Sequence, residues 1–119
     1  MRVPRWLPVT LWAALVFTLT SIPNPSLPAI AGGDKVVHAI MYGVLAALAL
    51  YAWPPRRRPP WAWLVVLVTV AAVGAADEWH QHYIPGRSAD VRDWTADAVG
   101  ALIGLALTWI VMAPRRRES

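Results

Sequence analysis

Long apolar segments alternate with short polar ones along the sequence, and this pattern predicts an all-α protein. Each segment is close to the roughly 20 residues that a helix needs to cross the hydrocarbon core of a membrane. Prolines follow the first and second segments, at Pro23 and Pro54, where a helix has to end. We expect a single domain, a bundle of four transmembrane helices at about residues 6–22, 34–53, 61–82 and 90–113.

Composition and charge favour a bilayer over water as the solvent. Hydrophobic residues make up 57% of the chain and charged residues 15%, whereas a soluble domain carries about a quarter charged residues. The net charge of +4 reflects arginine clusters that flank the apolar segments. Such clusters suit anionic lipid headgroups better than nucleic acid, which we do not expect as a partner. The absence of cysteine excludes disulfides and thiolate chemistry.

The charged residues also predict how the bundle is oriented. With four crossings, the N-terminus, the turn at 56–58 and the C-terminus lie on one side, together with eight of the eleven lysines and arginines. The positive-inside rule places that side, and hence both termini, in the cytoplasm. Six of the seven acids fall toward the opposite, outer side: Asp34, Asp77, Glu78, Asp90, Asp93 and Asp97.

The first apolar segment has a second interpretation. Arg2 and Arg5, the apolar run 7–19 and the Ala-Ile-Ala sequence at 29–31 together resemble a cleavable signal peptide. The gap between the apolar run and this A-x-A site is long and rich in proline, which favours a retained helix. The intact mass of the membrane-extracted protein distinguishes the two interpretations.

Polar residues inside the predicted helices recur at a spacing of four, so they share helix faces. These sets are Asp34, His38 and Tyr42 on the second helix, Asp77 with Gln81 and Glu78 with His82 on the third, and Asp93 with Asp97 on the fourth. The last face continues into Gly100-x-x-x-Gly104, a motif of small residues that lets another backbone come close. We therefore expect this face to contact other helices, either within the chain or in a homo-oligomer.

Asp97 lies about one turn inside the fourth predicted span, where a charge is costly. An acid near the bilayer centre costs on the order of 2.5–3.5 kcal/mol, and less near the interface. We therefore expect Asp97 to face the bundle and to lie within bonding distance of His38, Lys35 or Arg87. Ionisable groups within a membrane are candidates for function by default.

The polar residues resemble two signatures of the VanZ-like membrane protein family. The first is Asp34-Lys35-x-x-His38-x-x-x-Tyr42-x-x-Leu45, and the second is Asp77-Glu78-x-x-Gln81-x-x-x-Pro85-Gly86-Arg87 followed by Asp93, Asp97 and Gly100. The resemblance implies a multi-pass protein of the bacterial cytoplasmic membrane. The VanZ-like family is named for an accessory protein that confers low-level teicoplanin resistance. The resemblance implies no settled reaction. Asparagine is common in the family at the position of Asp97.

Charge and resemblance together give these residues candidate roles. We expect His38 to act with Glu78 or Asp97 as an acid–base pair, since histidine titrates near neutral pH. Candidate ligand-binding residues are Asp34, Lys35, Tyr42, Asp77, Gln81, Arg87 and Asp93. The basic ones, with Arg92, suit a phosphate or carboxylate headgroup. The function expected is binding or modification of an envelope lipid or lipid-linked amphiphile, linked to glycopeptide resistance.

A divalent metal is a further alternative. Candidate ligands for zinc or manganese are His38 with Asp97, Asp93 or Glu78. His80 and His82, two residues apart, lie on different helix faces and form no shared helical site. The sequence contains no His-x-x-x-His or acid-rich motif, and an ion-pair network of the same residues needs no metal. We therefore assign no metal ligand and leave the cofactor open.

Simpler explanations exist for several of these residues. Asp34 follows two glycines and suits a helix cap, while Asp90 and Asp93 suit the positive end of a helix dipole. A cluster that only holds the helices in register would indicate a non-catalytic interaction or permeability-modifying protein. A small transporter is the third hypothesis, for which four short spans leave little room.

Overall fold

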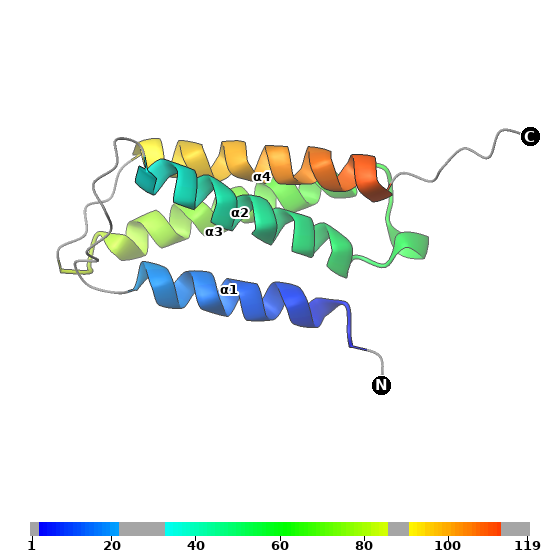
Figure 1. The fold of residues 1–119 in the computed structure, drawn as a ribbon, viewed down its shortest axis with the longest axis horizontal. Helices are drawn as coiled ribbons and strands as arrows, with labels where there is room; N and C mark the ends of the chain where they lie inside the picture. The colour runs from blue at the N-terminus through cyan, green and yellow to red at the C-terminus, as the bar shows by residue number, and fades with distance from the viewer. Residues whose placement is uncertain (1–2, 22–32, 86–90, 113–119) are drawn as a thin grey trace, which may run out of the picture.

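Four α-helices make up most of the structure, a computed structural model that describes residues 3–21, 33–85 and 91–112, and only the backbone of Gly33 and Asp34. They are α1 (Trp6–Thr20), α2 (Gly33–Ala52), α3 (Ala62–Gln81) and α4 (Val91–Met112), with a 3-10 turn, η1 (Pro55–Arg57), between α2 and α3. The helices lie side by side and successive helices run in opposite directions (Figure 1). The described residues form no strand, so the predicted all-α bundle is confirmed.

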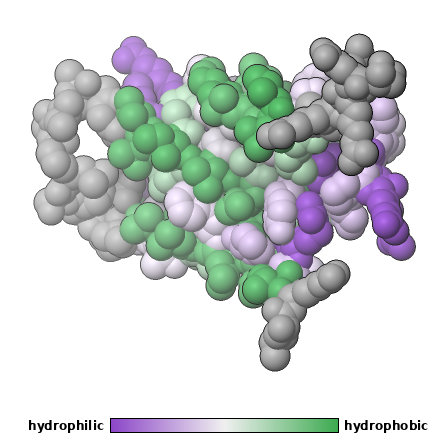
Figure 2. Space-filling model, turned by 45° about the vertical axis from the view of Figure 1, so that its right-hand side comes forward, coloured by the Kyte–Doolittle hydropathy of each residue, from purple (hydrophilic) through white to green (hydrophobic). Residues whose placement is uncertain are grey.

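Three of the described helices, α2, α3 and α4, are long and apolar enough to cross a membrane. α1 is apolar but has 15 residues, about 22 Å of helix against a hydrocarbon core of about 30 Å, so its full crossing stays a prediction. Large apolar side chains such as Val68, Leu107 and Ile110 are exposed. The face in Figure 2 carries hydrophobic residues over its middle and hydrophilic ones toward the ends, as contact with lipid tails requires.

Prolines account for several helix ends. α2 stops before Pro54, and α3 begins after the Pro59-Pro60 pair. The ends of the expected ranges lie within two residues of those of the described helices, which is ordinary variation. Several expectations fall outside the described residues: the cleavage sequence 29–31, the arginines at 2, 87 and 115–117, Asp90, and the side chain of Asp34.

α2 and α4 pack with their backbones in contact. A Cβ atom added to Gly100 would overlap the carbonyl group of Ala39, and one added to Gly104 would overlap that of Gly43. Glycine is therefore required at both positions of α4 for this close approach. The face that bears Asp97 contacts other helices, as the sequence predicts, and its glycines serve packing within one chain.

α1 is attached to the bundle through side chains on one of its faces. The indole Nε1 of Trp12 donates a hydrogen bond of 2.8 Å to the carbonyl oxygen of Met41 on α2. Further along the same helix Val16 and Thr20 are buried, and Val16 belongs to the hydrophobic core with Tyr42 of α2. These contacts make α1 an integral part of the helical core.

Arginine side chains cap α2 at the end of the bundle where α1 begins. Arg58 donates from Nη2 to the carbonyl oxygens of Leu50 at 3.0 Å and Trp53 at 2.6 Å. Arg5 donates from Nε to the carbonyl oxygen of Tyr51 at 2.9 Å. Partial burial lowers the pKa of Arg58 and repulsion from Arg5 lowers it further, yet a guanidinium stays charged near neutral pH. The bonds satisfy carbonyl groups that the last turn of a helix leaves without partners.

Candidate functional site

Eight polar side chains meet inside the bundle near one end, and we refer to them as the polar cluster. They are Thr20, His38, Tyr42, Asp77, Glu78, Gln81, Asp93 and Asp97. Each residue is at most 9% exposed, and together they come from all four helices. The alternating helix directions explain this gathering, because the C-terminal ends of α1 and α3 lie near the N-terminal ends of α2 and α4 (Figure 1).

His38 of α2 and Asp97 of α4 form a buried pair within the cluster. Nδ1 of His38 lies 2.8 Å from Oδ1 of Asp97, so of the three partners expected for this acid the structure shows His38. Oδ2 of Asp97 lies against Gly74 of α3, where an added Cβ would be 3.2 Å away. That oxygen has no hydrogen-bond partner among the described residues. When Nδ1 donates to Asp97, Nε2 is the ring nitrogen left to accept a proton or to bind a ligand.

Asp77 of α3 joins three helices through its two carboxylate oxygens. Oδ1 accepts a hydrogen bond of 2.9 Å from the hydroxyl of Thr20 on α1, and Oδ2 accepts one of 2.9 Å from the hydroxyl of Tyr42 on α2. Tyr42 lies on the helix face that the spacing of Asp34, His38 and Tyr42 identifies in the sequence. Thr20 is missed by sequence reasoning, because a lone threonine near the end of an apolar segment gives no sign of a partner 57 residues away.

Lys35, Gln81 and Glu78 complete the surroundings of the buried aspartates. Nζ of Lys35 lies 3.4 Å from Oδ1 of Asp93, and the lysine side chain is 37% exposed. Glu78 and Gln81 both point into the protein from the last turns of α3 and are buried. Nε2 of Gln81 has no hydrogen-bond acceptor within the described part of the chain, so it is available to a bound molecule.

The remaining predicted residues lie at the edge of the cluster or beyond the described chain. His82 is exposed, while His80 stacks on Phe17 of α1 with 5.2 Å between ring centroids. The two histidines are therefore separated, as their spacing predicts. The side chain of Asp34 and all of Arg87 fall outside the described residues, so the roles assigned to them stay predictions.

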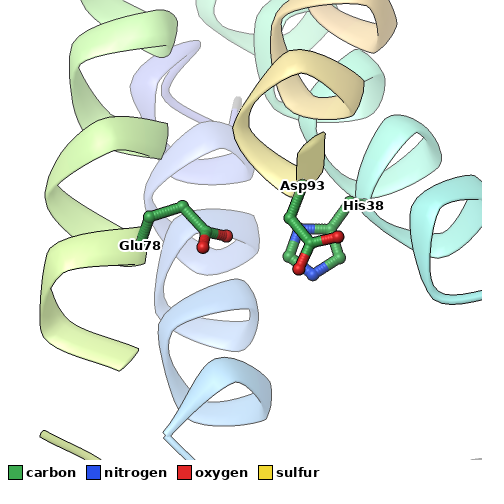
Figure 3. Close-up of side chains that lie close together, drawn as sticks. All are labelled: His38, Glu78 and Asp93. Atoms are coloured by element: carbon green, nitrogen blue, oxygen red, sulfur yellow. The ribbon is translucent and has the colours of Figure 1, made fainter. Parts of the chain in front are cut away.

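Three members of the cluster lie close enough together to offer ligand atoms to one metal ion. His38, Glu78 and Asp93 each offer one ligand atom, and these atoms lie within 4.8 Å of one another. All three residues are buried. Glu78 extends from α3 toward the other two, which come from α2 and α4 (Figure 3). One imidazole and two carboxylates form a set of donors that divalent cations bind.

An apolar groove of about 290 Å³ runs between α1 and α3 beside the polar cluster. Phe17 and Val16 of α1 and Val73 of α3 form part of its apolar wall. Asp77 and His80 lie along the same groove, one and two turns further along α3 than Val73. The groove therefore connects an apolar surface with the buried carboxylate of the cluster.

A second cavity, of about 540 Å³, lies between α3 and α4 at the same end of the bundle. It is lined by Ala75, Glu78, Trp79, His82, Tyr83, Val91 and Trp94. Glu78 therefore borders both the cluster and a space rimmed by aromatic side chains. Aromatic side chains of this kind are typical of the region where membrane meets water.

The fold and the cluster together define the class: a helical membrane protein with a buried site of acids and histidine. The sequence matches the family described as VanZ/LLP1 over residues 2–112, nearly the whole chain. The chain therefore belongs to this family, as its two signatures indicate. Comparisons with curated proteins and with solved structures gave no match.

Proposed function

We propose that this VanZ/LLP1-family protein binds a lipid or lipid-tailed amphiphile of the bacterial cell envelope. The observation that carries the proposal is the apolar groove between α1 and α3, which leads to the buried carboxylate of Asp77. A chain of methylene groups in the groove would place its headgroup at the polar cluster. Ligand sites typically combine a mainly apolar lining with a few polar groups that fix orientation, and this arrangement does so.

The polar cluster offers both acceptors and donors to such a headgroup. Glu78 accepts hydrogen bonds from hydroxyl or amine groups, and Nε2 of Gln81 donates one to a phosphate or carbonyl oxygen. Lys35, partly exposed beside Asp93, adds positive charge for an anionic group, and the exposed Arg92 of the same helix as Asp93 adds more. A headgroup that carries both an anionic oxygen and a hydroxyl or amine fits this set best.

The distribution of charge supports an outward-facing site. Arg5 and the arginines at 56–58 lie at the end of the bundle remote from the cluster, which the positive-inside rule assigns to the cytoplasm. The cluster then opens to the outer leaflet of the bacterial cytoplasmic membrane. A lipid-tailed glycopeptide such as teicoplanin, or an envelope lipid on which it acts, belongs to the class of ligand proposed.

Blocking the groove tests the proposal. Val73→Phe fills the apolar wall between α1 and α3, whereas Val68→Phe adds the same ring to an exposed position of α3 outside the groove. We expect native mass spectrometry of the detergent-extracted protein to show a co-purified lipid on the wild type and on Val68→Phe, but not on Val73→Phe. Equal lipid binding by the two variants, or none on the wild type, contradicts the proposal.

A second function is favoured by the bonds that Asp77 makes to Thr20 and Tyr42, which join three helices. These bonds suit a structural cluster in a non-catalytic interaction or permeability-modifying protein. The two functions differ in what His38→Ala and Glu78→Gln do to the protein in cells. A ligand site predicts loss of function with normal membrane abundance, and a structural cluster predicts that abundance and function fall together.

A further inference from the structure

We infer that His38, Glu78 and Asp93 bind one divalent transition-metal ion, zinc or manganese, and that Asp97 orients the histidine for this ion. The inference rests on the geometry and charge of these four buried side chains. It does not depend on the amphiphile proposed above, and the test below contains no lipid.

The three ligand atoms are near the separation that a metal requires. They lie within 4.8 Å of one another, whereas ligands about 2.1 Å from a tetrahedral ion lie about 3.4 Å apart. A change of side-chain rotamer is enough to bring the atoms from the larger separation to the smaller one. Glu78, which reaches in from α3, has the most rotatable bonds of the three (Figure 3). The helices that carry these residues pack directly against one another, so little backbone movement is needed.

Asp97 supplies the support that a metal-bound histidine needs. Ligating histidines almost always donate their other ring N–H to a carboxylate, a carbonyl or water, which fixes the tautomer and the orientation of the ring. Nδ1 of His38 makes this bond to Asp97 at 2.8 Å, so Nε2 is the nitrogen assigned to the metal. This supporting role also explains why the Asp97 side chain, only 1% exposed, is buried against an imidazole.

A cation also offsets the excess of acids in the cluster. The described members include four buried carboxylates, those of Asp77, Glu78, Asp93 and Asp97, and one imidazole. Lys35 is bonded to Oδ1 of Asp93, so Oδ2 of that residue is the oxygen assigned to the metal. Buried charges are stable when they are paired or coordinate a metal, and a divalent ion compensates two of them at once.

The donor set limits the choice of ion and leaves room for a further ligand. One imidazole with two carboxylates suits zinc or manganese better than calcium or magnesium, which favour oxygen alone. Three protein ligands leave at least one coordination position for water or for an oxygen of a bound molecule. A site of this kind is open, in contrast to the closed four-ligand sites that only stabilise a fold.

Manganese binding to the whole protein, purified in detergent without a polyhistidine tag and stripped with EDTA, tests the inference. Electron paramagnetic resonance reports the free ion during a titration with MnCl₂, and ZnCl₂ is then added as competitor. We expect one Mn²⁺ per chain, displaced by Zn²⁺. Pulsed measurements on the bound ion should detect one imidazole nitrogen, and this coupling should disappear in His38→Gln.

Variants distinguish the three proposed ligands, His38, Glu78 and Asp93, from the other acids of the cluster. Asp97→Asn keeps an acceptor oxygen for the histidine but removes the negative charge that raises its basicity, and should weaken Mn²⁺ binding by about 10–100-fold. Glu78→Gln or Asp93→Asn should weaken it by at least as much. Asp77→Asn removes a neighbouring buried carboxylate that is not a ligand and should retain the bound ion. Melting temperatures of the metal-free variants identify any that fail to fold. Absence of Mn²⁺ binding by the wild type, of the nitrogen coupling, or of any difference between Glu78→Gln and Asp77→Asn overturns the inference.

Discussion

The carboxylate of Asp97 lies 2.8 Å from Nδ1 of His38, and this buried bond joins α4 to α2 within the polar cluster. The bond requires an acceptor oxygen at position 97 but not a negative charge. We therefore expect the free energy of unfolding of Asp97→Asn to be within about 1 kcal/mol of the wild-type value, because the amide oxygen can still accept a hydrogen bond from the ring. Asp97→Ala leaves the buried N–H unpaired and should cost about 1–3 kcal/mol. Denaturation in detergent measures both, and equal stability of the alanine and asparagine variants would argue against the bond.

The close approach of α2 and α4 depends on Gly100. In Gly100→Ala the new methyl group would overlap the carbonyl of Ala39, so the helices must separate. Overpacking of this kind costs about 1–3 kcal/mol or more, and here it also pulls His38 away from Asp97, one turn along. Val99→Ala, at the exposed neighbouring position, is the control and should change stability by less than about 0.5 kcal/mol. Equal melting temperatures of the two variants would show that the helices are not packed this closely.

The bond between Thr20 and Asp77 attaches the end of α1 to α3. Thr20→Val keeps the shape of the side chain but leaves Oδ1 of Asp77 without its donor, which should cost about 1–3 kcal/mol. Thr18→Val is the matched control, because Thr18 is exposed and its hydroxyl donates to the carbonyl of Ala14 in its own helix. Limited proteolysis of the detergent-extracted protein should cut near α1 faster in Thr20→Val alone. Similar digestion of both variants would show that this bond does not hold α1.

Arg58 stabilises the end of α2 in a way that its neighbours do not. Its guanidinium donates to the carbonyls of Leu50 and Trp53, whereas Arg56 is exposed. Arg58→Ala should lower the free energy of unfolding by about 1 kcal/mol, the usual net value of a hydrogen bond. Arg56→Ala removes the same charge from the same turn and should change stability by less than half as much. A larger effect of Arg56→Ala would assign the stabilisation to charge instead of to capping.

Much of the fold follows from the sequence because membranes leave few choices. A span in lipid has to satisfy its own backbone, so long apolar segments between prolines can only be helices. The spacing of Asp93, Asp97 and Gly100 also identifies which face of α4 meets the other helices. Whether α1 crosses the bilayer completely is less predictable, because its 15 apolar residues are fewer than a full crossing needs.

Most members of the candidate site are predictable from the sequence, although Thr20 is not, and of its pairings only that of His38 with Asp97 is expected, as one of three alternatives. Helical spacing and the family signatures identify His38, Tyr42, Asp77 and Asp97 as residues of one site. Which acid each of them bonds depends on helix rotation and on the distance between helices, which Gly74 and Gly100 set through contacts remote in sequence. The sequence offers Glu78, Asp93 and Asp97 as alternative partners of His38, and only the structure places Glu78 and Asp93 together beside this histidine.

We expect the polar cluster to open to the outside of the cell, and the turn that carries the arginines at 56–58 to lie in the cytoplasm. Because the chain has no cysteine, single cysteines introduced at exposed positions report on accessibility without background. Tyr83→Cys lies beside the cluster and Arg57→Cys lies in the turn at the other end. We expect a membrane-impermeant maleimide to label Tyr83→Cys in intact cells and Arg57→Cys only after lysis. Labelling of both positions from the same side of the membrane would contradict the account.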